Sequence, residues 1–238
     1  MSITGMFGPV VNTLAILLGG LFGLVFGRIF PARMKKTVIQ GIGLSVLLIG
    51  VNMALETKNS LVVIASLVLG GLAGEWINIE LRLEQLGTWF ERKLSHVRGS
   101  GNFSKAFVST SLIYCVGAMA IMGSLESGLK GNNSILYAKS LLDGISALVF
   151  ASSMGIGVLA AALPVLVYEG GLTLLAGLLQ SILSPDVIAE MSATGGLLIL
   201  GIGFNILEIK AIKVGNLLPG IFFSIPLTIW FTHLHLGA

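Results

Sequence analysis

Two carboxylates, Asp143 and Glu169, stand within long apolar stretches of the sequence. A charged group in hydrocarbon costs about 2.5–3.5 kcal/mol on insertion scales, so it normally faces a cavity or a partner. Either carboxyl group is therefore a candidate to carry a proton or bind a cation. Asp143 follows Lys139 by one helical turn, and its alternative role is a simple ion pair with that residue. Glu169 has no Lys or Arg within reach along its helix and precedes Gly170-Gly171, which permits a helix break.

Four asparagines occur in the same apolar segments. A side-chain amide both donates and accepts hydrogen bonds, so it suits a cation or polar solute, but it also bridges helices. Near one of them, Pro219 fits either an unwound segment that exposes carbonyls or an ordinary helix start. Together with the two carboxylates, the asparagines are our candidates for an ion or solute path: Glu169, Asn12, Asn52, Asn205, Asp143 and Asn216.

A ten-residue motif occurs twice, at 43–52 and 196–205, with six identical positions and a terminal Asn in each copy. Asn12 and Glu169 each stand five residues ahead of a further matching block, so spans 1–3 are predicted to recur as spans 6–8. Span 1 runs inward and span 6 outward, so the repeat is inverted, a pattern typical of secondary transporters. With these span ends, Asn12 and Asn52 fall toward the outer leaflet, and Glu169 and Asn205 toward the inner one.

The composition indicates an integral membrane protein. Hydrophobic residues make up 55% of the chain, charged residues only 11%, and the mean hydropathy is +0.96, whereas soluble domains carry about 25% charged residues. We predict an all-α protein with about eight transmembrane helices, in which spans 1–3 and 6–8 are inverted repeats around two central spans. The predicted spans are 6–27, 37–56, 60–77, 104–123, 136–153, 160–182, 192–209 and 213–232. A broken or re-entrant helix within 134–183 is an alternative to the split at 152–157.

The basic residues predict the orientation. Of the 14 Lys and Arg residues, 11 fall in the connections after spans 1, 3 and 7, which lie on one side if there are eight spans. That side is expected to be cytoplasmic, with both termini outside. The net charge of +3 thus reflects membrane insertion, and we expect the lipid bilayer and a small ion or solute, not nucleic acid, as partners.

The chain divides into four segments: a first repeat (1–77), a cytoplasmic amphipathic helix and linker (78–103), two central spans (104–159) and a second, inverted repeat (160–238). The 78–98 helix is either a surface helix that orients spans 3 and 4 or a site that binds a partner. The 32 glycines favour close helix packing, including homo-oligomers formed through glycine-rich faces.

Catalytic and cofactor chemistry is not indicated. The sequence shows no Ser/His/Asp set, no His-Glu metalloprotease pattern and no intramembrane Gly-Ser nucleophile with a basic partner. The single cysteine, Cys115, excludes an intrachain disulfide and an all-cysteine metal site, and the three histidines lack ligand spacing. We therefore expect no enzyme activity, metal or cofactor.

Three motifs carry a family resemblance: the opening Gly8-Pro-Val-Val-Asn12-Thr-Leu-Ala-Ile-Leu-Leu-Gly-Gly, Leu69-Gly-Gly-Leu-Ala-Gly-Glu75, and Gly195-Gly-Leu-Leu-Ile-Leu-Gly-Ile-Gly-Phe-Asn205. Over nearly the whole chain the sequence resembles the bacterial multi-pass proteins grouped as domain of unknown function 554, the YdfK/YqgA-like family. The resemblance implies a protein of the bacterial cytoplasmic (inner) membrane and brings no site residues.

The function that the residues favour is a small secondary transporter or ion-coupled permease, moving a cation or small polar solute. In this hypothesis Glu169 carries the proton or binds the coupling cation, and the asparagines line the path. Two alternatives stay open: an oligomeric passive ion channel, and a non-transporting scaffold or regulator that acts through the 78–98 helix.

Overall fold

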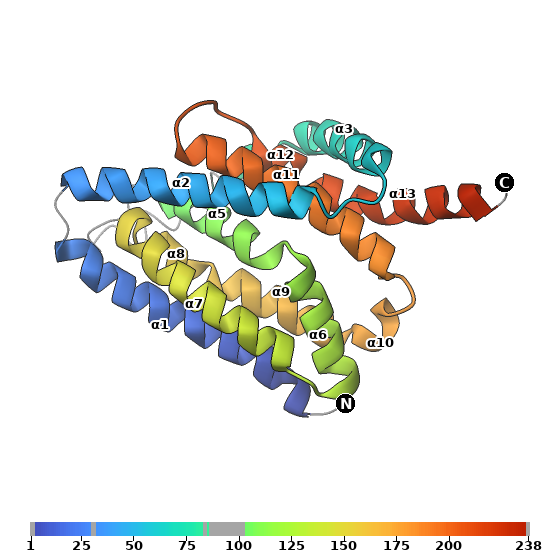
Figure 1. Ribbon diagram of the computed structural model, residues 1–238, viewed down its shortest axis with the longest axis horizontal. Helices are drawn as coiled ribbons and strands as arrows, with labels where there is room; N and C mark the ends of the chain where they lie inside the picture. Colours follow the sequence, from blue (N-terminus) through green and yellow to red (C-terminus); the bar gives the residue numbers. More distant parts are fainter. Residues whose placement is uncertain (1–2, 30–31, 83–84, 86–102, 237–238) are drawn as a thin grey trace. The chain divides into compact units, whose positions relative to one another are not determined.

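The computed structural model describes residues 3–29, 32–82, 85 and 103–236, and this part of the chain is helical with no strands (Figure 1). Seven of its helices are long and apolar enough to cross a membrane, or eight if the bent pair α5–α6 is one span. The chain is an all-α, multi-pass membrane protein, as predicted. The elements are η1 (Ile3–Met6), α1 (Phe7–Ile29), α2 (Ala32–Ala54), α3 (Ser60–Ile77), α5 (Phe103–Cys115), α6 (Ala118–Lys130), α7 (Ser134–Met154), α8 (Gly157–Ala160), α9 (Ala162–Leu174), α10 (Ala176–Leu179), α11 (Pro185–Ile206), α12 (Val214–Leu217) and α13 (Pro219–Leu236).

Local capping sets several of these boundaries. The side chain of Asn59 accepts a hydrogen bond from the backbone N–H of Leu61 and starts α3, which ends at Asn78 in the left-handed conformation. Ser184 caps α11 in the same way, followed by Pro185 at the first helical position. Pro219 likewise is the first residue of α13, so of the two alternatives for this proline the helix start is correct.

The fourth and sixth predicted spans need correction. The fourth span (104–123) is two helices, α5 and α6, bent by 57° at Val116-Gly117. The predicted split at 152–157 is confirmed, because α7 ends at Met154 and Gly155 takes a positive φ of 86°. The sixth span (160–182) is not continuous but breaks into α8, α9 and α10. In the predicted surface helix, residues 79–82 are helical, and apart from Gln85 the remainder lies outside the described residues.

The helices form two compact units. Unit 1 comprises 1–42, 83–115 and 119–179, and unit 2 comprises 43–82, 116–118 and 180–238. Helix α2 contributes its first part to unit 1 and its second part to unit 2. Each unit takes helices from both halves of the chain, and the four-segment division stays a prediction.

In unit 1, α1 and α7 run parallel and side by side (Figure 1). Three glycines at four-residue spacing on α1 lie against the α7 backbone so closely that a methyl group on any of them would overlap it. Small residues at this spacing let two membrane helices approach and pack. The successive pairs are Gly19 with Gly144, Gly23 with Leu148, and Gly27 with Ser152.

In unit 2, the two copies of the ten-residue motif lie antiparallel against each other. A methyl group on Gly203 would come within 2.6 Å of Leu47 Cδ2, and one on Gly50 within 2.7 Å of the Leu200 backbone nitrogen. Helices α3 and α13 also cross antiparallel, where Gly70 meets Gly220. Glycine therefore allows close packing of the two motif copies on each other and of α3 on α13.

Candidate functional site

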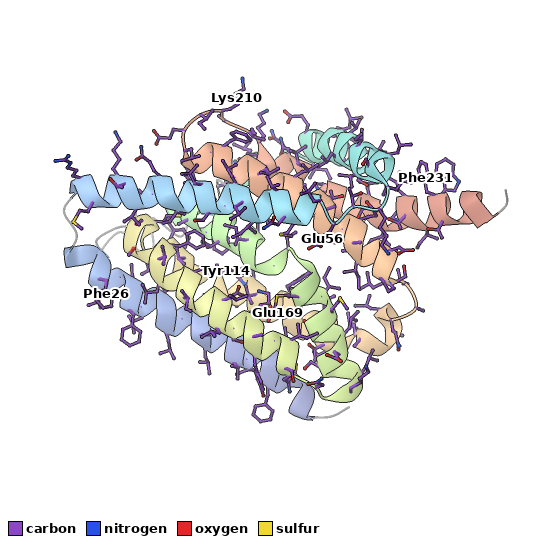
Figure 2. All side chains as sticks on the ribbon, viewed as in Figure 1. Phe26, Glu56, Tyr114, Glu169, Lys210 and Phe231 are labelled. Atoms are coloured by element: carbon purple, nitrogen blue, oxygen red, sulfur yellow. The ribbon has the colours of Figure 1, made fainter. Side chains whose placement is uncertain are left out.

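Three helices of unit 1 bring four polar side chains into the apolar interior. Asn12 on α1 and Glu169 on α9 have no exposed surface, and Lys139 and Asp143 on α7 are 6% and 8% exposed. In Figure 2, Glu169 lies among the helices of the unit, whereas Phe26 of α1 points outward. We call these four residues the charge cluster.

The amide of Asn12 joins the two carboxyl groups. Its Nδ2 donates to Asp143 Oδ2 at 3.0 Å and to Glu169 Oε1 at 2.9 Å, so both amide hydrogens are used. The parallel packing of α1 on α7 holds Asn12 beside Asp143, and α9 supplies Glu169. A single neutral side chain thus fixes the positions of carboxyl groups from two helices.

Lys139 completes the cluster. Its ammonium donates to Asp143 one turn along α7, and Nζ also lies 3.5 Å from Glu169 Oε1. The pairing with Asp143 follows from the sequence spacing. The contact with Glu169 could not be read from the sequence, because it joins two different helices.

The charge cluster contains more carboxyl groups than ammonium groups. When every group is ionised, one ammonium faces two carboxylates, which leaves one net negative charge in a site with almost no exposed surface. Burial of an uncompensated charge is costly, and a buried ion pair is favourable only when its groups are fully compensated. One additional proton or monovalent cation makes the cluster neutral.

Two buried oxygens of the cluster have no hydrogen-bond partner among the described residues: Asn12 Oδ1 and Glu169 Oε2. The hydroxyls of Thr173, one turn after Glu169 on α9, and of Ser124 on α6 are buried and unpartnered in the same unit. An unpaired buried polar group costs about 1–3 kcal/mol. The site therefore has free hydrogen-bonding capacity, chiefly as acceptors.

The expectation that Asn12 and Glu169 fall in opposite leaflets is wrong, because they are hydrogen-bonded to each other. The error comes from the predicted sixth span, which ran to residue 182. The candidate span is Gly157–Leu174, so Glu169 lies near its C-terminal end. Asn12 lies near the N-terminal end of the antiparallel α1, and the two residues meet at the same depth.

The two asparagines of the repeated motif, Asn52 and Asn205, belong to unit 2. Asn52 is exposed on α2. Asn205 donates to the carbonyl of Ile212 and accepts from its backbone N–H, each at 2.8 Å, which closes the loop after α11. The structure thus brings Asn12, Asp143 and Glu169 together, and it gives Asn205 a contact that closes a loop.

Asn216 takes part in a second polar network, in unit 2. Its Nδ2 donates to Glu75 Oε2, and its Oδ1 accepts from the backbone N–H of Glu80 at 2.7 Å. Lys213 donates to the other oxygen of Glu75 at 2.8 Å, and this hydrogen bond raises the pKa of the Lys213 ammonium. The network ties the start of α12 to the end of α3.

The sequence interpretation missed Glu190, which is 1% exposed in α11. Its carboxylate accepts hydrogen bonds from Thr57 Oγ1 at 2.7 Å and from the backbone N–H groups of Lys58 and Asn59 at 2.7 and 2.9 Å. The cap Ser184-Pro185 was the signal that could have found it, since that cap starts the helix before Glu190 instead of at 192. We call this contact the α2–α3 loop clamp.

Comparisons with known proteins agree with the membrane assignment. The family described as Protein of unknown function (DUF554) matches residues 7–229. The chain is 33% identical over 232 residues to the Bacillus subtilis (strain 168) protein named Uncharacterized membrane protein YdfK, covering 96% of this chain and 97% of that one. It is 32% identical over 233 residues to Uncharacterized protein YqgA of Escherichia coli (strain K12), covering 95% and 99%. No solved structure matches.

Proposed function

This chain belongs to the DUF554 family of membrane proteins, and we propose that it is a small proton-coupled secondary transporter of the bacterial cytoplasmic membrane. In this proposal Glu169 is the group that carries the proton. The single observation that carries the proposal is the charge cluster, in which two carboxyl groups share one ammonium inside an apolar unit.

The charge count gives the cluster two states. With one proton on a carboxyl group it is neutral and suited to its buried setting; without that proton it has one net negative charge. Glu169 is the natural holder of the proton, because its Oε2 lacks a partner among the described residues whereas Asp143 is bonded directly to Lys139. Intramembrane ionisable groups that alternate in this way are typical of proton pathways.

The repeated motif supports a transporter architecture. Corresponding positions of the two motif copies differ by 153 in residue number. Gly43 therefore corresponds to Gly196, and Leu207 corresponds to Ala54. The contact of Gly43 with Leu207 thus has its counterpart in the contact of Gly196 with Ala54. In each of these contacts a methyl group on the glycine would lie within 2.6 Å of its neighbour. This reciprocity is what a two-fold axis in the membrane plane produces, and inverted repeats related by such an axis allow alternating access by rocking. The predicted orientation, with both termini outside, is part of the same proposal.

Reconstitution into liposomes tests this function. The protein is reconstituted with a pH-sensitive dye inside, and solutes are added in groups while the dye reports proton movement. We expect a solute-dependent, saturable proton flux that Glu169→Gln abolishes. The matched control is Glu126→Gln, which changes an α6 carboxylate of the same unit that lies 3.6 Å from Lys130 at the surface.

Two outcomes would overturn the proposal. A proton flux unchanged by Glu169→Gln would remove Glu169 from the pathway. An ion current that neither saturates nor depends on a proton gradient would indicate a passive channel instead.

A further inference from the structure

We propose that the solute exchanged for the proton is a small monovalent organic cation that donates hydrogen bonds, with an ammonium or guanidinium head group. This inference rests on the proposed function and names its substrate class. It places the cation at the charge cluster itself, against Glu169 Oε2 and Asn12 Oδ1, so that proton and solute compete for one carboxylate.

The charge of the cluster selects a monovalent cation. The deprotonated cluster has one net negative charge, which one monovalent cation neutralises and a divalent ion would reverse. Among the described residues there is no group of three or more His, Cys, Asp or Glu side chains placed to hold a metal ion. Divalent cations such as Ca²⁺ and Mg²⁺ require about six or more oxygen ligands, far more than the unpartnered oxygens here.

The unpartnered groups of the charge cluster favour a ligand that donates hydrogen bonds. Both amide hydrogens of Asn12 are already used, and the Lys139 ammonium is bonded to Asp143 and close to Glu169. Within the four residues of the charge cluster, the atoms without a partner among the described residues are one carboxyl oxygen and one amide oxygen, both acceptors. An anion would find no uncommitted cationic donor in the cluster, whereas an ammonium or guanidinium group would satisfy both oxygens.

Lys139 shows that an ammonium fits these surroundings. Its Nζ reaches both carboxyl groups, and the distance of 3.5 Å to Glu169 Oε1 leaves the second oxygen of that carboxylate open. The side chain thus acts as a tethered equivalent of the ligand, placed on one side of Glu169. The free cation would approach the same carboxylate from its other oxygen.

The exchange step is a simple acid–base balance. A cation R–NH₃⁺ enters as the Glu169 carboxyl O–H bond breaks and the proton passes to water. The carboxylate and the cation then form an ion pair, so the net charge of the cluster is zero before and after the exchange. Among the described residues, the titratable groups that interact electrostatically with Glu169 are Lys139 and Asp143 of α7, Cys115 of α5 and the neighbouring Tyr168 of α9. Release of the cation and return of the proton complete the cycle.

Proton release measures this exchange directly. The purified full chain is held in weakly buffered detergent solution with a pH indicator, and millimolar guanidinium chloride or methylammonium chloride is added. NaCl and KCl serve as comparators at equal ionic strength. We expect saturable release of up to one proton per protein with the organic cations, none with Glu169→Gln, and full release with Glu126→Gln.

A proton titration of the same samples separates the two proposals. If wild type takes up one more proton than Glu169→Gln on acidification but releases none to guanidinium or methylammonium, the substrate class is wrong and the proton carrier stands. Equal release by Na⁺ or K⁺ also overturns the substrate class. If Glu169→Gln takes up as many protons as wild type, the proposed function itself fails.

The native cysteine provides a second readout. Cys115 is the single cysteine of the chain and lies at the end of α5, within electrostatic range of Lys139, Asp143 and Glu169. We expect guanidinium to change the rate of Cys115 alkylation by a membrane-permeant maleimide in wild type and in Glu126→Gln, but not in Glu169→Gln. The same change in Glu169→Gln would contradict binding at the cluster.

Discussion

Two fully buried glutamates, one in each unit, have opposite surroundings. Glu190 of unit 2 accepts three hydrogen bonds, from Thr57 Oγ1 and from the backbone of Lys58 and Asn59, and both of its oxygens are used. Glu169 of unit 1 shares one oxygen with Asn12 and Lys139, and its other oxygen has no partner among the described residues.

The difference separates a carboxylate whose two oxygens are both hydrogen-bonded from one that keeps an oxygen without a partner among the described residues. Three donors surround the Glu190 carboxylate and occupy both of its oxygens, so it holds the α2–α3 loop in place. Around Glu169 the number of acceptors exceeds the number of donors, and a second carboxyl group competes for the same ammonium. A buried glutamate therefore does not by itself indicate a functional site. The indication is a buried carboxylate whose charge and hydrogen-bonding capacity are not fully compensated by neighbouring groups.

The strongest test of this comparison is Glu169→Gln. The amide keeps the shape and an oxygen that accepts from Asn12, and it leaves Lys139 and Asp143 as a neutral pair, so we expect a folded protein. Proton-coupled flux in liposomes should fall to the background of empty vesicles, because no second exchangeable carboxyl group remains. Flux that persists would show that Glu169 is not the proton carrier.

Glu190→Ala should affect stability instead of transport. Loss of the carboxylate leaves three donors of the α2–α3 loop clamp without their acceptor, so we expect the free energy of unfolding to fall by about 3 kcal/mol. Glu190→Gln keeps an acceptor oxygen and should cost about 1 kcal/mol. Unfolding in mixed micelles measures both. Proton-coupled flux in liposomes should be unchanged, and a loss of flux as large as that expected for Glu169→Gln would contradict the structural role.

Gly23→Ala tests how the charge cluster is held. The added methyl group would overlap the Leu148 carbonyl oxygen of α7, and the backbone cannot yield without separating the helices. We expect a loss of about 2 kcal/mol in unfolding free energy and reduced flux, because Asn12 moves away from Asp143. Gly177→Ala is the matched control, since a methyl group there meets nothing within 4 Å. Equal behaviour of the two variants would argue against close packing at Gly23.

Lys58→Ala should have the smallest effect. The Lys58 ammonium lies 2.5 Å from Asp186 Oδ1, but the two side chains are 62% and 49% exposed. A surface pair of this kind contributes about 0.5 kcal/mol. The backbone N–H of Lys58 still donates to Glu190, so the loop clamp stays intact. A loss as large as that of Glu190→Ala would show that the side chain, and not the backbone, fixes the loop.

Much of the helical architecture followed from the sequence. Apolar runs located every spanning helix, and the third, 60–77, matches α3 at both ends because Asn59 and Asn78 cap it. The bend at Val116-Gly117 was not predicted, since Cys115, Met119 and Met122 continue the apolar pattern across it. The start of α11 was placed too late, because Asp186 and Glu190 make its first turns look like a polar loop.

The candidate site, like the helical architecture, could be predicted only in part from the sequence. Sequence chemistry alone selected Asn12, Asp143 and Glu169, because polar groups within apolar helices are costly and therefore rare. It could not decide which of the six candidates meet. Asn205 carries the same motif position as Asn52, yet its amide closes a local loop onto Ile212.

The sequence by itself determined that this chain is an all-helical membrane protein with a repeated motif and a few buried polar groups. Hydropathy and composition are local properties, and a bilayer permits few backbone structures. Only the tertiary structure decided that Lys139 approaches Glu169 and that Glu190 is fully satisfied. Both contacts depend on which helices pack together. The excess negative charge in unit 1 can be identified only when the side chains that α1, α7 and α9 bring together are known.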